Sequence, residues 1–353
     1  MPQTLSASVV GGGAGGQLSM RALVQSDRFH LAAVADLSAA ARQVLKERFP
    51  GVRVFASHRE MFDACPTDVV CVSTYPPTHE EVTLDALRLP LKGILVEKPL
   101  GHTAASGRRI LDAVRARRLP MAVPHGLLAK RASLEVVERV HAGEIGDLKL
   151  VEVQCTRWDI INAGIHWLNF FVTLTRNEPI DWVMALCDAT TRTYRDGMQV
   201  ETVAVTYAVT RTGVRVVMNT GDDVPISRPG KGTLFRLVGT AGLMEFWGWE
   251  NAYYLLNAAH PRGQLFTPEE YAVTGHQRHL EKMAEMIDAG TPDYSIAESS
   301  LMALEICEAA YLSSWHRCQV RFPLERFVPP PPSDWHPGEP YSGRGGGRDG
   351  RKL

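Results

Sequence analysis

The sequence predicts an N-terminal α/β domain built on a parallel sheet, followed by an α+β domain with a mostly antiparallel open sheet. Three observations lead to this fold class. The chain has 353 residues, which is more than one hydrophobic core usually organises. From residue 5 to about 124, short apolar runs alternate with amphipathic stretches of helical period, as in a parallel α/β sheet. After Gly146 the runs become longer and alternate apolar with polar residues, as in an antiparallel sheet.

The first domain is expected over residues 1–124. Because ligands bind at the C-terminal ends of the strands in open α/β sheets, the residues that follow each strand form its candidate site. The expected strands and helices are Leu5 to Val10, Gln17 to Ser26, Leu31 to Ala35, Ser38 to Phe49, Val69 to Ser73 and Gly93 to Val96.

The second domain is expected over residues 125–328. Its strands are expected at Leu148 to Trp158, Trp182 to Thr190, Val200 to Thr210, Gly213 to Thr220, Thr233 to Val238 and Leu243 to Trp247, with a short last strand from Gln319 to Phe322. Two helices, His276 to Ala289 and Ala297 to His316, are expected to close this domain. Residues 329–353 are rich in Pro and then in Gly and Arg, a composition that predicts an extended arm or a disordered tail.

Charge and composition exclude several classes of function. The formal net charge is -1 and no long basic run occurs, which argues against a nucleic-acid or membrane-surface partner and favours a small-molecule ligand. The six cysteines are scattered without zinc-site spacing, so we expect reduced thiols and no metal. No apolar leader and no apolar run of about 20 residues occurs, so the expected location is the cytoplasm.

The strongest local motif follows the first strand, where residues 11–16 match the pattern G-x-G-x-x-G between a strand and a helix. Gly11 permits a tight turn, Gly13 lets the backbone approach a pyrophosphate, and Gly16 lets the helix pack closely on its strand. The first N–H groups of the helix then face the phosphates, as in a Rossmann dinucleotide site. The residues expected to bind the cofactor here are Gly11, Gly13, Ala14, Gly15 and Gly16.

Asp36 ends the second predicted strand, about 20 residues after the glycines. A carboxylate at this place accepts hydrogen bonds from the ribose hydroxyls of NAD and repels a 2′-phosphate. Leu37 follows instead of an arginine, so NADP lacks its usual counter-charge. We therefore predict NAD as the cofactor in preference to NADP.

Four motifs beyond the glycines carry a family resemblance: Glu97-Lys98-Pro99 after the fifth strand, Thr74 to His79 after the fourth, Gly143 to Gly146, and Asn162 to His166. In their order and spacing the chain resembles the glucose-fructose oxidoreductase and inositol dehydrogenase (Gfo/Idh/MocA) family, from Val9 to about Pro323. The resemblance implies an NAD(P)-dependent oxidoreductase that transfers hydride between nicotinamide and a secondary alcohol of a sugar, polyol or glycoside. It also implies a homodimer or homotetramer that associates through one face of the second sheet.

The resemblance assigns roles to individual residues. Lys98 matches the lysine that lies between nicotinamide and substrate, where an ammonium group can stabilise a developing alkoxide and exchange a proton. His166 matches the second acid/base or substrate-orienting group. Thr74, Pro76 and His79 are expected to line the nicotinamide side of the cofactor, although His79 could equally cap the following helix. Glu97 is expected to fix the loop that aims Lys98.

The sequence also departs from the family pattern. Asn162 stands where the family commonly has Asp, and it can hydrogen-bond a hydroxyl but cannot take its proton. The glycine-rich stretch before it is replaced by residues 156–161, among which Asp159 could partly compensate. The weaker candidates for substrate contact are His125, Arg157, Trp158, Tyr254 and His276.

Two alternative functions remain open from the sequence. One is a redox-neutral NAD-dependent glycosidase or lyase on the same fold. It remains open because Asn162 and the stretch before it depart from the family pattern. The other is a non-catalytic NAD-binding regulator, which is less favoured because Lys98 and His166 are both retained. Fold alone decides neither.

Overall fold

The computed structural model describes residues 3–188, 190 and 193–330. The first sheet has six parallel strands in the order β3-β2-β1-β4-β5-β6, the doubly wound order of a Rossmann domain. Its strands are β1 (Leu5–Val10), β2 (Phe29–Ala35), β3 (Arg53–Phe55), β4 (Val69–Val72), β5 (Gly93–Val96) and β6 (Met121–Ala122). Its helices are α1 (Ala14–Gln25), α2 (Ala39–Arg48), α3 (His58–Ala64), α4 (His79–Ala86) and α5 (Ala104–Ala116), with a 3₁₀ turn η1 (Pro76–Thr78).

The second sheet has nine strands in the order β16-β15-β14-β13-β7-β12-β11-β8-β17, and among them only β7 and β12 pair in parallel. The strands are β7 (Leu148–Thr156), β8 (Ile180–Cys187), β11 (Val203–Thr210), β12 (Arg215–Gly221), β13 (Thr233–Gly239), β14 (Gly242–Phe246), β15 (Tyr253–Asn257), β16 (Gln264–Phe266) and β17 (Val320–Arg321). A separate hairpin joins β9 (Thr193–Arg195) to β10 (Met198–Val200). The fold class predicted from the sequence is confirmed.

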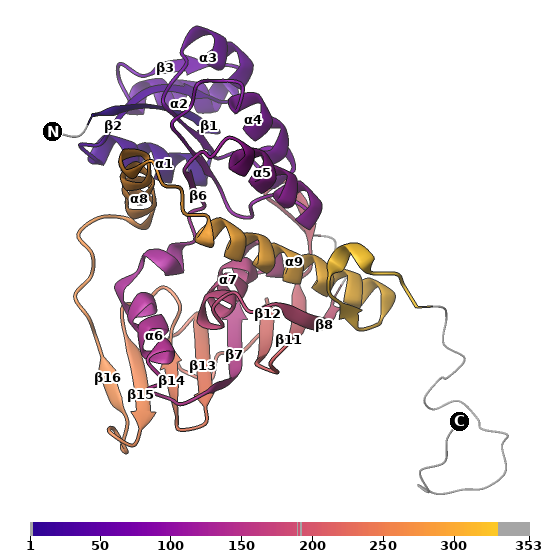
Figure 1. The fold of residues 1–353 in the computed structure, drawn as a ribbon. Coiled ribbons are helices and arrows are strands. Elements are labelled where there is room, and N and C mark those ends of the chain that lie inside the picture. Colours follow the sequence, from indigo (N-terminus) through magenta and orange to yellow (C-terminus); the bar gives the residue numbers. More distant parts are fainter. Residues whose placement is uncertain (1–2, 189, 191–192, 331–353) are drawn as a thin grey trace, which may run out of the picture.

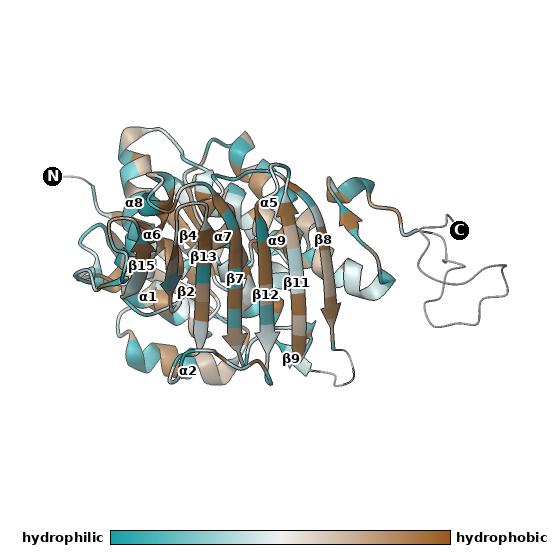
Figure 2. Ribbon diagram, turned by 90° about the horizontal axis from the view of Figure 1, so that it is seen from below, coloured by the Kyte–Doolittle hydropathy of each residue, from teal (hydrophilic) through white to brown (hydrophobic). Residues whose placement is uncertain are grey.

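Helices cover only one face of this second sheet (Figure 1). They are α6 (Arg131–His141), α7 (Ile165–Leu174) and α9 (Ser295–His316). The other elements after the first sheet are helix α8 (Gly275–Ala289) and the short turns η2 (Gly126–Ala129), η3 (Ile160–Gly164) and η4 (Leu324–Arg326). Trp167 and Phe170 of α7 pack against Phe235 and Phe246 of the sheet, and Phe171 belongs to the same core. The opposite face lies open in Figure 2, where β7, β12, β11 and β8 run side by side.

The two long C-terminal helices are shared between the domains. We expected both to close the second domain, but α8 packs beside α1 on the Rossmann sheet (Figure 1), where Leu280 and Met283 join the core that includes Met20 and Leu23. Helix α9 lies between the domains and packs against both α5 and α7. Amphipathic periodicity predicts a buried face but does not say which sheet covers it.

Several predicted boundaries move in the structure. Helix α1 begins at Ala14 rather than Gln17, because the glycines that form the turn continue directly into the helix. The hairpin β9–β10 and the strands β15 and β16 were not predicted. Most of the predicted tail, from residue 331, lies outside the described residues. Within the described ranges, no helix is both long and apolar enough to span a membrane.

Candidate active site

The glycine turn between β1 and α1 is built for close backbone contact. Gly11 has φ +101°, and a Cβ added to it would lie 2.3 Å from the carbonyl oxygen of Ser73. A Cβ on Gly16 would lie 1.8 Å from the carbonyl oxygen of Gly11. Gly13 differs, because an added Cβ would meet nothing within 4 Å. Gly11 and Gly16 are therefore required by packing, whereas Gly13 leaves open space at the helix start.

This open space fits a dinucleotide. Gly13 caps α1 without a side-chain hydrogen bond, and the first N–H groups of a helix have no intrahelical acceptor. Asp36 follows β2, and its Oδ2 accepts a 2.7 Å hydrogen bond from the backbone N–H of Gly12. Its Oδ1 accepts one of 2.7 Å from the N–H of Ser38. A carboxylate is thus anchored beside the turn where a ribose would lie, next to donors that would face a pyrophosphate.

Glu97 links the helix start to the loop after β5. Its side chain is buried, and a Cβ on Gly15 would lie 3.1 Å from its Oε1. Oε1 accepts a 2.7 Å hydrogen bond from Nε2 of His276, and Oε2 accepts one of 3.2 Å from the N–H of Lys98. Burial acts to raise the pKa of Glu97, but the hydrogen bond and charge of His276, together with the charge of Lys98, lower it overall. His276, a weak substrate candidate in the sequence, is the partner of this carboxylate.

His79 ties together the loops that follow β4 and β5. Its ring is buried, with Nδ1 3.0 Å from the carbonyl oxygen of Pro99 and Nε2 2.9 Å from that of Thr74. Burial lowers its pKa. The alternative role as a helix cap is wrong, because His79 is the first residue of α4 and no side chain caps that helix. Pro76 is buried beside it, while Thr74 is half-buried and hydrogen-bonded to Thr78.

Lys98 reaches from the Rossmann domain to the second domain. Its Nζ donates a 3.0 Å hydrogen bond to the backbone carbonyl of Asn162, which lies in η3. This turn is a π-helical segment that continues directly into α7. Lys98 and Asn162, 64 residues apart in the chain, are therefore brought into direct contact.

Asp159 holds Asn162 in this position. Its Oδ1 accepts 2.8 Å hydrogen bonds from both the backbone N–H and the Nδ2 of Asn162. Its Oδ2 accepts a 2.7 Å hydrogen bond from Nη1 of Arg195, on the β9–β10 hairpin. The sequence drew attention to Asp159 without placing it, and it gave no sign of Arg195.

His166 lies in the first turn of α7 and is buried. Its ring meets His125 and Trp249 edge to face, with centroids 5.3 and 5.2 Å away. Its Nδ1 has no hydrogen-bond partner among the described residues. Burial lowers the pKa of His166 well below its ordinary value, and the charge of Lys98 acts in the same direction. The imidazole is therefore neutral near pH 7 and able to accept a proton.

The weaker substrate candidates fall in different places. His125 is fully buried behind His166, with Nε2 2.8 Å from Oγ of Ser300, and burial lowers its pKa well below the ordinary value. Arg157 and Trp158 are exposed at the end of β7, and the guanidinium of Arg195 lies 4.6 Å from the Trp158 ring. Tyr254 lies on β15 and donates to the carbonyl of Arg262.

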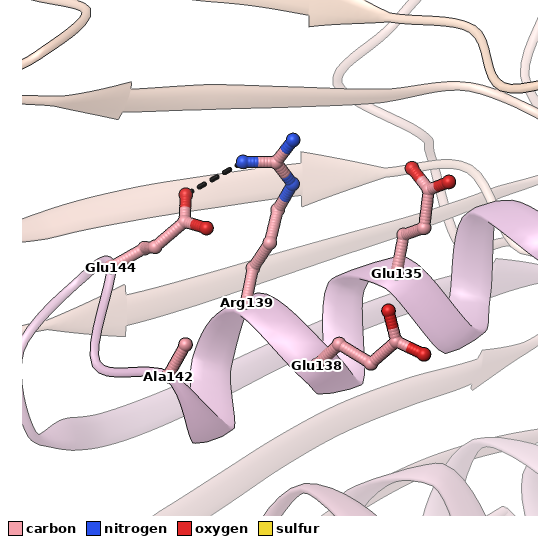
Figure 3. Close-up of a pocket in the computed structure, with 5 residues that line it drawn as sticks. All are labelled: Glu135, Glu138, Arg139, Ala142 and Glu144. Carbon is pink, nitrogen blue, oxygen red and sulfur yellow. Dashed lines mark hydrogen bonds and ion pairs between the residues drawn. The ribbon is translucent and has the colours of Figure 1, made fainter.

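Two other polar clusters lie apart from these residues. A hollow beside α6 is lined by Glu135, Glu138, Arg139, Ala142 and Glu144, and Figure 3 shows Arg139 directed at Glu144. None of these is a predicted site residue. His58, Glu81 and Asp85 come close enough to hold a metal ion, but Arg59 already donates to both carboxylates. The expectation that the active site uses no metal stays a prediction.

Comparison with known proteins agrees with this geometry. A family model described as the oxidoreductase family with an NAD-binding Rossmann fold matches residues 5–125. The chain is 26% identical over 321 residues to the rhizopine catabolism protein MocA of Rhizobium meliloti, a match that covers 86% of this chain and 92% of that protein. It is 37% identical over 114 residues to an inositol 2-dehydrogenase of Klebsiella pneumoniae, but that match spans only 31% of this chain and 33% of the relative.

Among solved structures, a levoglucosan dehydrogenase in complex with NADH and levoglucosan superposes with a TM-score of 0.77. The sequence identity is 15%, and the match covers 91% of this chain and 100% of that one. This likeness shows a shared fold over both domains. The first domain thus matches the model of the NAD-binding oxidoreductase family, and most of the chain is similar to MocA, in agreement with the resemblance seen in the sequence.

Proposed function

We propose that the protein transfers hydride between NAD(H) and a secondary alcohol of a sugar, polyol or glycoside. One observation carries the proposal: Nζ of Lys98 lies 3.0 Å from the backbone oxygen of Asn162, beside the turn that leads into His166. The ammonium group of Lys98 thus lies against the turn that contains Asn162 and leads into His166, and its charge acts on the His166 imidazole. This set suits a hydroxyl group that loses or gains a proton while its carbon exchanges hydride.

The cofactor would be held by the residues that the sequence predicted. The N–H groups from Gly13 to Gly16 would bind the pyrophosphate, and Asp36 would bind the adenosine ribose and disfavour the 2′-phosphate of NADP. Thr74 and Pro76 would border the nicotinamide, while His79 and Glu97 would fix the two loops around it. When bound, NAD supplies the hydride acceptor, and NADH the donor, at C4 of the nicotinamide.

The protein's own groups manage the proton. In the oxidation direction, Lys98 would hydrogen-bond the substrate oxygen and stabilise its developing negative charge. His166 would accept the hydroxyl proton, because its lowered pKa leaves it unprotonated at neutral pH. Asn162 would orient the substrate. We further propose that the protein acts as a homodimer or homotetramer joined through the open face of the second sheet.

A substrate panel tests this function. The purified protein is mixed with NAD or NADP and with myo-inositol, aldoses and glycosides, and NADH absorbance is followed beside product analysis by mass spectrometry. We expect NADH to form with a polyol or sugar and faster with NAD than with NADP. Cleavage of a glycoside without net NADH would contradict a net redox reaction and favour the redox-neutral alternative.

A further inference from the structure

We propose that Asp159, held by Arg195, is a positioning residue that fixes the carboxamide of Asn162 as a hydrogen-bond acceptor for a substrate hydroxyl. The inference rests on the proposed function, because it adds a specificity element to the same site. It concerns the part of the chain where the sequence departs from the family pattern, at residues 156–162.

The orientation of the Asn162 carboxamide follows from the chemistry of its partner. A carboxylate oxygen accepts hydrogen bonds and has no proton to donate, so the group facing Oδ1 of Asp159 at 2.8 Å must be the Nδ2 of Asn162. The side-chain oxygen of Asn162 then points away from Asp159. No described residue donates a hydrogen bond to this oxygen. In the proposal it is the group that accepts a hydrogen bond from the substrate.

Asp159 is itself fixed by several contacts. It is buried and caps η3, where one oxygen serves both the backbone and the side chain of Asn162. Its other oxygen is paired with Arg195 at 2.7 Å, which offsets the charge of a carboxylate removed from water. The guanidinium of Arg195 is stacked over Trp158 with its Cζ 4.6 Å from the ring centroid.

Residues at the two ends of the β9–β10 hairpin contribute to the hydrogen bonding of η3. Arg195 ends β9, and Glu201 follows β10. Oε1 of Glu201 accepts a 2.7 Å hydrogen bond from the N–H of Ile160, and its Oε2 accepts one of 2.8 Å from the hydroxyl of Tyr311. Two N–H groups of η3 are thus bound by carboxylates: that of Ile160 by Glu201, which follows β10, and that of Asn162 by Asp159, which is paired with Arg195 of β9.

The hairpin also contacts the loop expected to border the nicotinamide. At the tip between its strands, a Cβ added to Gly197 would lie 3.4 Å from Cβ of Tyr75. Tyr75 lies between Thr74 and Pro76. A continuous series of contacts therefore runs from Lys98 through Asn162 and Asp159 to Arg195. The hairpin that carries Arg195 also lies close to Tyr75, in the loop after β4.

This arrangement predicts a specificity. An acceptor that cannot turn favours a substrate hydroxyl and discriminates against a fluorine or methoxy group at the same carbon, since neither can donate a hydrogen bond. Without the carboxylate of Asp159, the carboxamide of Asn162 can rotate and present Nδ2 instead. The discrimination between hydroxyl and fluorine should then fall.

Kinetics of variants test the inference with the panel compound that gives the fastest NADH formation and with its deoxyfluoro analogues. We expect D159N and R195Q to lower kcat/KM for the hydroxyl compound about 10- to 100-fold, with KM for NAD within twofold of the wild-type value. R195K, which keeps the charge, should retain more activity than R195Q. For D159N, the preference for hydroxyl over fluorine should fall at least tenfold.

The matched control is E245Q, which removes another buried carboxylate paired with an arginine on the second sheet, away from η3. It should lower stability without changing the hydroxyl preference. An unchanged preference in D159N, or an equal change in E245Q, would overturn the inference.

A readout that needs no substrate separates this inference from the proposed function. If the wild-type protein oxidises no panel compound, the proposed function fails, and amide hydrogen exchange over residues 160–164 then decides the positioning role. We expect exchange at least tenfold faster in D159N and R195Q than in the wild type and in E245Q. Equal protection in all four proteins would overturn the inference.

Discussion

Lys98 contacts the second domain through a hydrogen bond to a backbone carbonyl, and the proposed function gives it a role in proton transfer. We predict that Lys98→Met lowers kcat by about 10²- to 10⁴-fold, the usual contribution of a positioned proton-transfer group. NAD affinity measured by calorimetry should stay within threefold, because the glycine turn and Asp36 are untouched.

The matched control is Lys92→Met. Lys92 lies immediately before β5, at the opposite end of this strand from Lys98, and pairs with Asp68 at 2.9 Å near the surface. This variant should keep the wild-type kcat. Turnover by Lys98→Met above about a tenth of the wild-type rate would remove Lys98 from the proposed mechanism.

Buried histidines make stability depend on pH. Burial lowers the pKa of His279 from 6.5 to about 4, and it lowers the pKa values of His125 and His166 well below 6.5. The unfolded chain therefore binds protons that the folded protein does not, so stability falls as pH drops below about 6.5. For His279 alone, the loss between pH 8 and pH 5 is roughly 2 kcal/mol.

Urea unfolding at a series of pH values checks this prediction. His279→Gln can still donate to the carbonyl of His125, the 3.1 Å contact that His279 makes, but it cannot titrate. The variant should lose less stability between pH 8 and pH 5 than the wild type. His30→Gln, at an exposed position, is the control for the substitution itself. Identical pH profiles for His279→Gln and the wild type would contradict the assignment.

At the scale of elements, the junction of β1 and α1 contains one glycine that packing requires, Gly16, and one that we expect only cofactor binding to require, Gly13. A Cβ on Gly16 meets the Gly11 carbonyl at 1.8 Å, whereas a Cβ on Gly13 meets nothing within 4 Å. We predict that Gly16→Ala destabilises the protein by about 1–3 kcal/mol, the range for an overpacked site, in urea unfolding. Gly13→Ala should change stability by about 1 kcal/mol or less, yet weaken NAD binding at least tenfold.

The two variants serve as controls for each other, since both replace a glycine of the same turn by alanine. NAD affinity is measured by calorimetry at a temperature where both variants are folded. Normal NAD affinity in Gly13→Ala would mean that the open space at this residue does not receive the cofactor.

The same junction shows what the sequence could predict. The glycines, Asp36 and the Glu97-Lys98-Pro99 loop follow β1, β2 and β5, and the parallel pairing of this sheet places all these strand ends at one edge. The pairing of Glu97 with His276 could not be predicted, because 179 residues separate them and the packing of α8 on the Rossmann sheet joins them. The β9–β10 hairpin was also missed, since strands of three residues carry too little alternation to be detected.

At the scale of the whole molecule, the uncovered face of the second sheet is apolar at one end. Leu186 is 70% exposed, Met184 49% and Val205 44%. Leu186 pairs with Val205 across β8 and β11, and Met184 pairs with Tyr207, so these residues are neighbours on one face of the sheet. Towards β13 and β14 the same face carries the ion pairs of Arg236 with Glu152 and Glu245. An apolar patch with a charged border is typical of a surface that binds another protein.

The proposed self-association through this face gives a direct prediction. Leu186→Glu places a charge at the centre of the apolar end, and two copies of that charge would face a desolvated interface, because a symmetric dimer uses the same patch twice. We expect light scattering after gel filtration to give a dimer or tetramer for the wild type and a smaller species for Leu186→Glu at micromolar concentration. Val24→Glu is the matched control, since Val24 is 59% exposed on α1, outside this sheet, and should leave the mass unchanged. A wild-type monomer, or an unchanged mass for Leu186→Glu, would rule out this face as the contact between subunits.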